Sequence, residues 1–331
     1  MRLTRVITVT CATVLALAAC GSGGGTTTTK TTGSAAPSSG GGLEKSTITV
    51  GVVPVPSSSP LYIAEKRGFF KEEGLTVKTE IIQAPQAVMP KILNGSMDAF
   101  LTSYVSLMAI QDSGAAKLKL FQHVQTGAPG IAGVVVPKGS PVKAAADLKG
   151  KTVAVNVLKA LGQTTTNAHL QEAGLKPEDV KFVAIQFAEQ LGALATKKVD
   201  AAWLVEPFLS AAVKEGATQI IDTTSGPTAG IPIDGWGVSE KWLADNPKTA
   251  AAFHRALAKA QKIAGEDRNA INEVVPTYTQ IPAPAVAAMK LGTFGMEPDM
   301  AAFQKLADLL HGYGYLKAKM DVSTLIASKV E

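Results

Sequence analysis

Two stretches about one hundred residues apart share one pattern, and this repeat constrains the fold most. Residues 200–217, DAAWLVEPFLSAAVKEGA, begin as a short apolar run that is typical of a strand buried in a parallel sheet. At Glu206-Pro207 the spacing becomes helical, because proline lacks an N–H and suits the first helical position, with Glu206 at the cap. Gly216 is a typical helix end. The stretch predicts a strand, a turn that carries a carboxylate, and a helix.

The earlier copy of the pattern begins at Asp98 and ends at Gly114. The same number of positions separates this pair as separates Asp200 from Gly216. Upstream, the segment EEGL of residues 72–75 resembles EAGL of residues 172–175. Units of one strand and one helix resemble each other in general, which is the alternative explanation. The repeat nevertheless favours a duplicated α/β lobe.

The N-terminus has the features of a secretion signal. Arg2 and Arg5 precede an uncharged apolar stretch at 6–19, which is too short to span a membrane and is typical of a signal peptide. It ends in LAACG, which resembles the lipobox of bacterial lipoproteins and implies removal of residues 1–19 and a lipid on Cys20. Gly, Ser and Thr dominate the segment that follows and give it too little apolar surface to fold, so residues 20–46 are expected to form a disordered tether.

Charge and cysteine content exclude several function classes. The net charge of +5 falls to +3 once Arg2 and Arg5 are removed, and the remaining arginines are scattered, so no nucleic-acid surface is expected. Cys11 lies in the signal peptide, which leaves Cys20 without a disulfide partner in the chain. The four histidines are dispersed, so neither a metal site nor a cofactor is expected.

The order of predicted strands and helices indicates two lobes joined by two crossings. Lobe 1 is expected to contain residues 47–136 and 232–331, and lobe 2 residues 137–231. From residue 239 onward the pattern is helical, with helices expected over 241–263, 269–275, 285–294, 299–311 and 322–328. This tail is expected to pack on lobe 1. Crossings at 134–137 and 232–238 would leave few covalent constraints between the lobes and would form a hinge.

Several segments resemble one family of transport proteins. The run PLYIAEKRGFFKEEGL at 60–75 resembles the PLYxAxxxGFFxxEGL signature of nitrate/sulfonate/taurine-type solute-binding proteins of ABC importers. NGSMD at 94–98, DLKGK at 147–151 and WLVEP at 203–207 match further segments in family order. The resemblance implies two α/β lobes in the type II periplasmic-binding-protein arrangement, with a ligand between them.

The resemblance also implies the partners and the location. A membrane permease and its ATPase would receive the solute, and Cys20 would hold a monomeric binding protein on the outer face of the cytoplasmic membrane. The family includes thiamine-pyrimidine binders and related biosynthetic enzymes. A secreted enzyme of the pyrimidine-synthase type is therefore one alternative, although the cysteine-rich motif of those relatives is absent. A ligand sensor that delivers no solute is the other alternative.

Ligands of open α/β sheets bind beyond the carboxyl ends of the strands, against helix N-termini. That rule selects the turns after the strands, together with aromatic residues near them. The candidate ligand-binding residues are Ser57, Ser58, Tyr62, Ser103, Tyr104, Lys159, Gln163, Thr164, Glu206 and Trp236.

Each candidate also has an ordinary structural explanation. The serines, the threonine and the glutamine could cap helices, and Lys159 could be a solvated loop residue. Tyr104 could pack on the lobe surface, and Glu206 could be a local helix cap. Trp203 is expected to lie in the core, whereas Trp236 is expected to line the cleft.

The pocket candidates favour a particular kind of ligand. Arginine is the usual partner of carboxylate or sulfate, and the arginines of the mature chain fall on predicted helices away from the strand-end turns. Glu206 could accept a hydrogen bond from a ligand amine or ring N–H, and Tyr104 and Trp236 could stack on it. A small organic solute that bears nitrogen is therefore expected, such as an aminosulfonate or a heterocyclic vitamin precursor, rather than an inorganic oxyanion.

Overall fold

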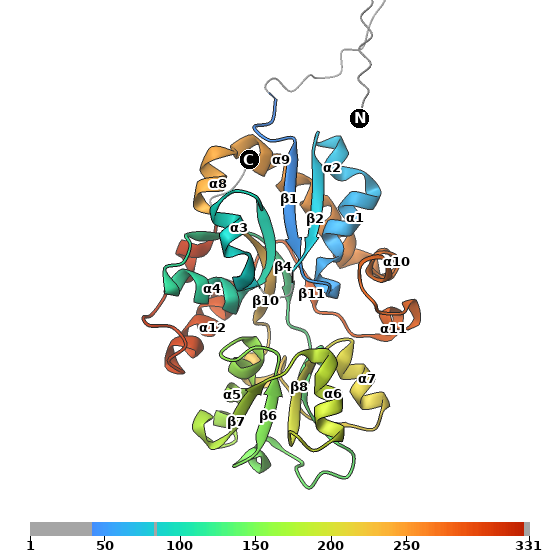
Figure 1. Ribbon diagram of the computed structural model, residues 1–331, viewed down its shortest axis with the longest axis vertical. Helices are drawn as coiled ribbons and strands as arrows, with labels where there is room; N and C mark the ends of the chain where they lie inside the picture. The colour runs from blue at the N-terminus through green and yellow to red at the C-terminus, as the bar shows by residue number, and fades with distance from the viewer. Residues whose placement is uncertain (1–41, 83–84, 328–331) are drawn as a thin grey trace, which may run out of the picture. The chain divides into compact units, whose positions relative to one another are not determined.

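The computed structural model describes residues 42–82 and 85–327. These ranges contain two β-sheets with helices on both faces of each (Figure 1). The first sheet has the strand order β11-β4-β10-β3-β1-β2. Its strands are β1 (Thr47–Val52), β2 (Thr76–Ile81), β3 (Ala99–Ser103), β4 (Leu118–Thr126), β10 (Pro232–Ser239) and β11 (Thr293–Phe294).

The second sheet repeats the arrangement of the first. Its order is β7-β6-β8-β5-β9, and its strands are β5 (Ala132–Val136), β6 (Thr152–Val155), β7 (Lys181–Ala184), β8 (Ala201–Val205) and β9 (Thr218–Asp222). In both sheets three parallel strands, β2-β1-β3 and β7-β6-β8, are followed by an antiparallel strand. The expected duplication of an α/β lobe is confirmed by this shared order.

Asp98 and Asp200 have the same structural role in the two lobes. Asp98 precedes β3 and exchanges hydrogen bonds with the backbone of β1. Asp200 precedes β8 and does the same with the backbone of β6. The Asp98 N–H donates to the Thr49 carbonyl and Oδ2 accepts from the Thr49 N–H, both at 2.8 Å. Asp200 forms the equivalent pair with Thr152, at 2.9 and 2.8 Å. The repeated aspartate in the sequence therefore marks the repeated joint between strands.

Helices from both ends of the chain cover the first sheet. One face packs on α1 (Ser59–Arg67), α2 (Phe69–Glu72), α9 (Pro247–Glu266) and α10 (Arg268–Tyr278), and the other on α3 (Met89–Leu93), α4 (Tyr104–Ser113) and α12 (Met300–Gly312). In α9 the buried residues Phe253, Ala256, Leu257 and Ala260 recur at helical spacing. Helices α9, α10 and α12 of the tail thus pack on the first sheet.

The second sheet is covered in the same way. Its cores lie under α5 (Leu161–Glu172) on one face and under α6 (Phe187–Ala195) and α7 (Phe208–Lys214) on the other. The remaining short helices of the described residues are α8 (Glu240–Asp245), α11 (Ala283–Ala288), η1 (Pro56–Ser58), η2 (Pro85–Val88), η3 (Ala145–Leu148), η4 (Pro177–Asp179), η5 (Gly226–Thr228) and η6 (Val322–Leu325).

The first crossing between the sheets lies earlier than the sequence predicts. Strand β5 belongs to the second sheet, where it pairs with β8 and β9, so the chain crosses at residues 127–131 and the expected boundary after residue 136 is wrong. The second crossing is at residues 223–231. The two segments contact each other, because the Gly127 N–H donates to the Ile231 carbonyl at 2.9 Å.

Three predicted helices differ from the observed elements. The helix expected over 241–263 is divided at Asn246-Pro247 into α8 and α9, because proline suits a helix start. The one expected over 285–294 ends at Ala288 and is followed by β11. The one expected over 322–328 is a short 3-10 turn, and Ser328 lies outside the described residues.

Helix α5 connects three parts of the chain. Its Asn167 Nδ2 donates to the Tyr315 hydroxyl of the C-terminal tail at 2.9 Å, and its Gln171 accepts from the Tyr313 hydroxyl at 2.9 Å. On another side, His169 Nε2 lies 3.1 Å from the hydroxyl of Thr228, in the second crossing. The tail segment after α12 therefore contacts lobe 2 as well as lobe 1.

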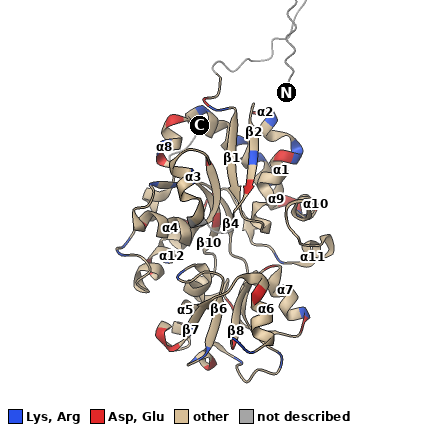
Figure 2. Cartoon of the chain, in the orientation of Figure 1, with Lys and Arg blue, Asp and Glu red and all other residues tan. Residues whose placement is uncertain are grey.

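The surface charges are mixed. Figure 2 shows Lys and Arg interspersed with Asp and Glu, and ion pairs such as Arg255–Glu73 and Lys259–Glu72 join α9 to α2 and its end. Across the two described ranges, every helix is too short or too polar to cross a membrane.

Candidate functional site

A pocket of about 200 Å³ lies between residues of the first sheet and residues of the second. Most of its wall is apolar, formed by Val53, Val55, Leu101, Ile131, Val157, Leu161, Phe187, Trp203, Val205, Ile233 and Leu291. Its ionisable residues are Glu206, Asp234 and Lys290. A mostly apolar pocket with a few polar groups is typical of a small-molecule site.

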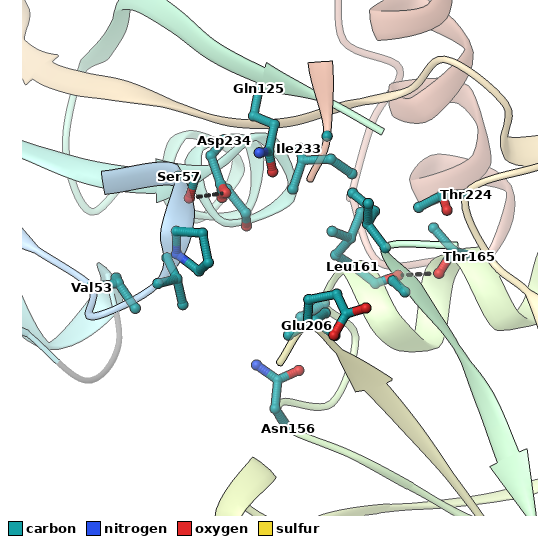
Figure 3. A pocket seen from close by; sticks show the side chains of 18 of the residues that line it. Val53, Ser57, Gln125, Asn156, Leu161, Thr165, Glu206, Thr224, Ile233 and Asp234 are labelled. Carbon is teal, nitrogen blue, oxygen red and sulfur yellow. Dashed lines mark hydrogen bonds between the residues drawn. The ribbon is translucent and has the colours of Figure 1, made fainter. Parts of the chain in front are cut away.

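The turns after the parallel strands supply part of the polar wall. Ser57 follows β1, Ser103 ends β3, Asn156 follows β6 and Glu206 follows β8, and all four line the pocket. Figure 3 shows Ser57 on one side of the pocket and Glu206 and Asn156 on the other. The pocket thus lies where the carboxyl ends of the parallel strands of the two sheets meet.

Asp234 of β10 contributes a carboxylate from lobe 1. Its Oδ2 accepts a 2.7 Å hydrogen bond from the Ser57 hydroxyl, and its other oxygen has no donor among the described residues (Figure 3). Removal of water around the carboxyl raises the pKa of Asp234 from 3.8 to about 6, although the Ser57 bond acts in the opposite direction. Asp234 can therefore change charge near physiological pH.

The groups behind Asp234 are neutral. Tyr104 is fully buried and hydrogen-bonds His123 Nδ1 at 2.8 Å, while His123 Nε2 lies 2.9 Å from the Thr126 hydroxyl. Burial lowers the pKa of His123 to about 4 and raises the pKa of Tyr104, which Asp234 raises further. This chain of side chains gives Asp234 no positive partner at neutral pH.

Glu206 contributes the second carboxylate, from lobe 2. It is 7% exposed, and it accepts hydrogen bonds from the Ser210 hydroxyl at 2.7 Å and from the Ser210 N–H at 3.3 Å. The Lys290 N–H, from the segment after α11, lies 3.5 Å from Glu206 Oε1. Helix α7 begins at Phe208, with Pro207 at its cap, one residue later than the sequence predicts. Glu206 is thus both bonded to the first turn of α7 and open to the pocket.

Two carboxamides line the pocket without a hydrogen-bond partner in the described part of the chain. Gln125 of β4 is 7% exposed, and its side chain forms no hydrogen bond with any described residue. The side chain of Asn156, after β6, is half-buried and also forms no hydrogen bond with a described residue. Figure 3 shows the Gln125 carboxamide close to Asp234. Buried polar groups are normally hydrogen-bonded, so these amides are available to a ligand or to water.

Trp203 and Phe187 form an aromatic wall, with ring centroids 5.8 Å apart. The Trp203 indole N–H donates to the Thr223 hydroxyl at 2.9 Å, which fixes the ring. Gly162 of α5 lies directly against this ring, and a methyl group there would overlap it. Trp203 is buried, as expected from the sequence, and it also lines the pocket.

Three of the candidates selected from the sequence meet at the pocket: Ser57, Ser103 and Glu206. Trp236 and Tyr104 do not. Trp236 is fully buried in the core beneath α9, and the Tyr104 ring packs edge-on against Phe303 of α12, with centroids 4.6 Å apart. Both rings point into a core of lobe 1, so the expectation that Trp236 lines the cleft is wrong.

The other candidates make local contacts. The Ser58 hydroxyl donates to the Val53 carbonyl, Thr164 donates to the Ala160 carbonyl, and Tyr62 stacks on Tyr278 at 3.9 Å. Lys159 is exposed, and its N–H donates to the Gln163 side chain at 2.7 Å. None of these five residues lines the pocket, because each is engaged in its own turn, helix end or side-chain stack.

Sequence reasoning missed Asp234, Gln125, Asn156 and Lys290. Asp234 and Gln125 lie on antiparallel strands, to which the rule of strand carboxyl ends does not apply. A signal for Asp234 was present, since an acidic residue interrupts the otherwise apolar strand 232–238. Lys290 lies in the tail, where the pattern of apolar residues indicates helices and carries no signal for a binding site.

No group of three or more His, Cys, Asp and Glu residues within 42–82 and 85–327 is placed to hold a metal ion. The proposed anchor Cys20 lies outside the described residues.

The family follows from a match that covers most of the chain. Residues 55–270 match the family described as NMT1/THI5 like. The chain is a member of this family. Among NMT1/THI5-like relatives, the putative binding protein YtlA of Bacillus subtilis is 26% identical over 234 residues, which are 66% of this chain and 67% of that protein. The nitrate import ATP-binding protein NrtC of Synechococcus elongatus is 26% identical over 68% of this chain, which spans 36% of NrtC.

Solved structures show the same fold as this NMT1/THI5-like chain. The alkanesulfonate-binding protein SsuA of Xanthomonas axonopodis pv. citri, bound to MOPS, is 18% identical with a TM-score of 0.72 over 86% of this chain and 99% of that one. The desulfurization enzyme DSZB is 17% identical with a TM-score of 0.65 over 86% of this chain and 97% of that one. The type II periplasmic-binding-protein fold expected from the sequence is therefore confirmed.

Proposed function

We propose that this chain is the substrate-binding subunit of an ABC importer, which captures a small organic solute between its two lobes and delivers it to a permease. The observation that carries the proposal is the pocket between the two sheets, lined from both lobes. Membership of the NMT1/THI5-like family supports it, as do relatives and structural neighbours named as binding proteins.

The chemistry of the pocket favours binding over catalysis. Its described lining contains hydroxyls, carboxamides, two carboxylates and one lysine, and neither cysteine nor histidine. Nucleophilic catalysis needs a nucleophile beside a base. The Ser57 hydroxyl has the Asp234 carboxylate beside it, but the histidine or cysteine that usually forms such a pair is not among these residues. An enzyme on the same fold, as the neighbour DSZB illustrates, is the competing proposal.

The solute that we propose bears nitrogen and an apolar body. Glu206 and Asp234 accept hydrogen bonds, and Trp203 and Phe187 offer an aromatic wall. No arginine is among the described lining residues, although arginine is the side chain that best matches two oxygens of an oxyanion. An inorganic oxyanion is thus the less favourable ligand.

Capture would involve closure of the lobes about the two crossings. Residues 127–131 and 223–231 are the connections that pass between the sheets in the middle of the chain, and they contact each other through Gly127 and Ile231. Two adjacent strands of backbone form a hinge, because small changes in their dihedral angles rotate one lobe against the other.

The chain would be held outside the cytoplasmic membrane by a lipid on Cys20. The lipobox-like LAAC sequence and the charged start of the apolar N-terminal stretch support this location. The Cys20→Ala variant should move to the soluble fraction after cell lysis. Retention of that variant in the membrane fraction would refute the anchor.

The function is tested by binding and turnover measured together. The protein is mixed with nitrate, sulfonates, pyrimidines and amines, its thermal stability and tryptophan fluorescence are followed, and the solutes are then analysed for chemical change. A binding subunit stabilises on adding one class of solute and returns it unchanged. Conversion of a bound solute to product would instead establish the enzyme.

A further inference from the structure

The charge of the pocket narrows the class of solute. The carboxylates of Asp234 and Glu206 enter the pocket from different lobes, and neither forms an ion pair with a described residue. The single basic residue of the described lining, Lys290, is exposed, and its ammonium lies against Gly130. An anionic group placed in this pocket would be repelled by two carboxylates and would have no arginine to bind.

A set of polar atoms on the lobe 1 side has no hydrogen-bond partner among the residues that the structure describes. Asp234 uses one oxygen to accept from Ser57 and has the other free, and the buried Gln125 carboxamide beside it is unbonded within the described residues (Figure 3). The neutral Tyr104 and His123 lie behind Asp234, so no internal cation competes for its charge. A charged N–H donor would complete this set with a strong hydrogen bond to Asp234 and a second one to Gln125.

We infer that the solute is an organic cation, an ammonium, amidinium or protonated amino-heterocycle on an apolar body without a sulfonate or carboxylate, whose N–H groups bind Asp234 and Gln125. Its apolar body lies against Trp203 and Phe187, where a flat ring stacks well. Glu206 faces it from lobe 2. This inference rests on the proposed function, and it excludes the aminosulfonates that the general proposal allows.

Probes that share one ring and differ in charge test the inference. Benzamidine is a cation, benzamide is neutral and benzenesulfonate is an anion, and each is titrated calorimetrically into the full chain near neutral pH. Benzamidine should bind at least roughly tenfold more tightly than benzamide, because a hydrogen bond to a charged group is stronger than one between neutral groups. Benzenesulfonate should not bind.

The variants identify the group responsible. Asp234→Asn should abolish the preference for benzamidine over benzamide, while Asp308→Asn, an exposed carboxylate on α12, should keep it. Tighter binding of benzenesulfonate than of benzamidine, binding of none of the three, or a preference that survives in Asp234→Asn would overturn the inference.

A second arm distinguishes failure of the inference from failure of the proposed function. The refolded, solute-free chain is incubated with a bacterial extract, and the solutes that it retains are released by heat and identified by mass spectrometry. Retention of an organic cation supports the inference, and retention of an anion alone overturns it but leaves the binding function intact. Retention of no solute would count against the binding function itself.

Discussion

Ser57 and Asp234 lie 177 positions apart in the sequence, and the hydroxyl of the first donates a 2.7 Å hydrogen bond to the carboxylate of the second. The bond joins the turn after β1 to the strand that returns from lobe 2. It occupies one carboxylate oxygen and orients the other toward the pocket. The protonation state of Asp234 therefore governs what the lobe 1 side of the pocket can accept.

We predict that affinity for a cationic solute rises as the pH increases through about 6, the pKa of Asp234. Below that pH Asp234 is protonated and carries no charge to attract a cation. His123, with a pKa near 4, is already neutral at the pH where Asp234 ionises. Calorimetric titrations on both sides of the transition measure the effect. The Asp234→Asn variant should show a flatter profile, and an affinity that falls as pH rises would contradict the prediction.

The same carboxyl should affect folding stability with the opposite sign. Because the folded-state pKa is raised from 3.8 to about 6, the folded chain binds more protons than the unfolded chain between these values. The contribution of Asp234 to stability should therefore decrease as pH rises across this window. Comparison of the wild type with Asp234→Asn in chemical denaturation at several pH values isolates it. A difference between the two that does not change with pH would exclude this linkage.

Glu206→Gln should weaken binding of the same solute by roughly ten- to a hundredfold, because a hydrogen bond to a charged group contributes about 1.5–3 kcal/mol. Glu215→Gln, at the exposed end of the same helix α7, is the matched control and should leave affinity unchanged. Thermal melting of both variants without solute shows whether they fold. Equal affinity of Glu206→Gln and wild type would remove Glu206 from the binding site.

The equivalent aspartates should differ in their effect on stability. Asp98 is 2% exposed and accepts hydrogen bonds from the Thr49 N–H, the Trp242 indole and Lys45, whereas Asp200 is exposed. Asp98→Ala leaves buried donors unpaired and should cost about 2–4 kcal/mol, and Asp200→Ala about 1 kcal/mol or less. Urea denaturation followed by tryptophan fluorescence compares them. Equal losses of unfolding free energy in the two variants would mean that the burial of Asp98 does not add to stability.

Tyr315→Phe should weaken solute binding without altering the pocket. The variant loses the 2.9 Å bond from Asn167, which joins the tail to lobe 2, and one such bond contributes about 0.5–1.5 kcal/mol. The fraction of molecules in which the lobes are closed should fall. The apparent affinity for the solute should therefore fall by roughly two- to tenfold. Tyr62→Phe, whose ring stacks within lobe 1, is the control. Small-angle scattering should show a larger radius for Tyr315→Phe alone.

The sequence predicts the repeated unit well because the repeat depends on local chemistry. A short apolar run, a turn and a helix ended by Gly114 or Gly216 are set by neighbouring residues, and both glycines adopt the left-handed conformation typical of a helix end. The position of the first crossing depends instead on which sheet β5 joins. That pairing with β8 and β9 is made between distant residues, and apolar residues suit either sheet.

The candidate site residues also divide into those set by local sequence and those set by packing between distant segments. Ser57, Ser103 and Glu206 were predicted because they follow parallel strands, and the fold brings such ends together. Asp234 was missed because its side chain enters the pocket from an antiparallel strand. Tyr104 was selected for its position after β3, but its ring turns into the core against Phe303. Which way a side chain points at a strand end depends on packing that the sequence does not show.

Helix α5 carries residues for three purposes within two turns. Thr165 lines the pocket, Asn167 bonds to the C-terminal tail and His169 contacts the second crossing. An α-helix is stiff over this length, because each turn is fastened to the next by backbone hydrogen bonds. A solute that displaces Thr165 must therefore shift Asn167 and His169 by a comparable amount. One stiff helix thus links the pocket wall, the tail and the crossing between the lobes.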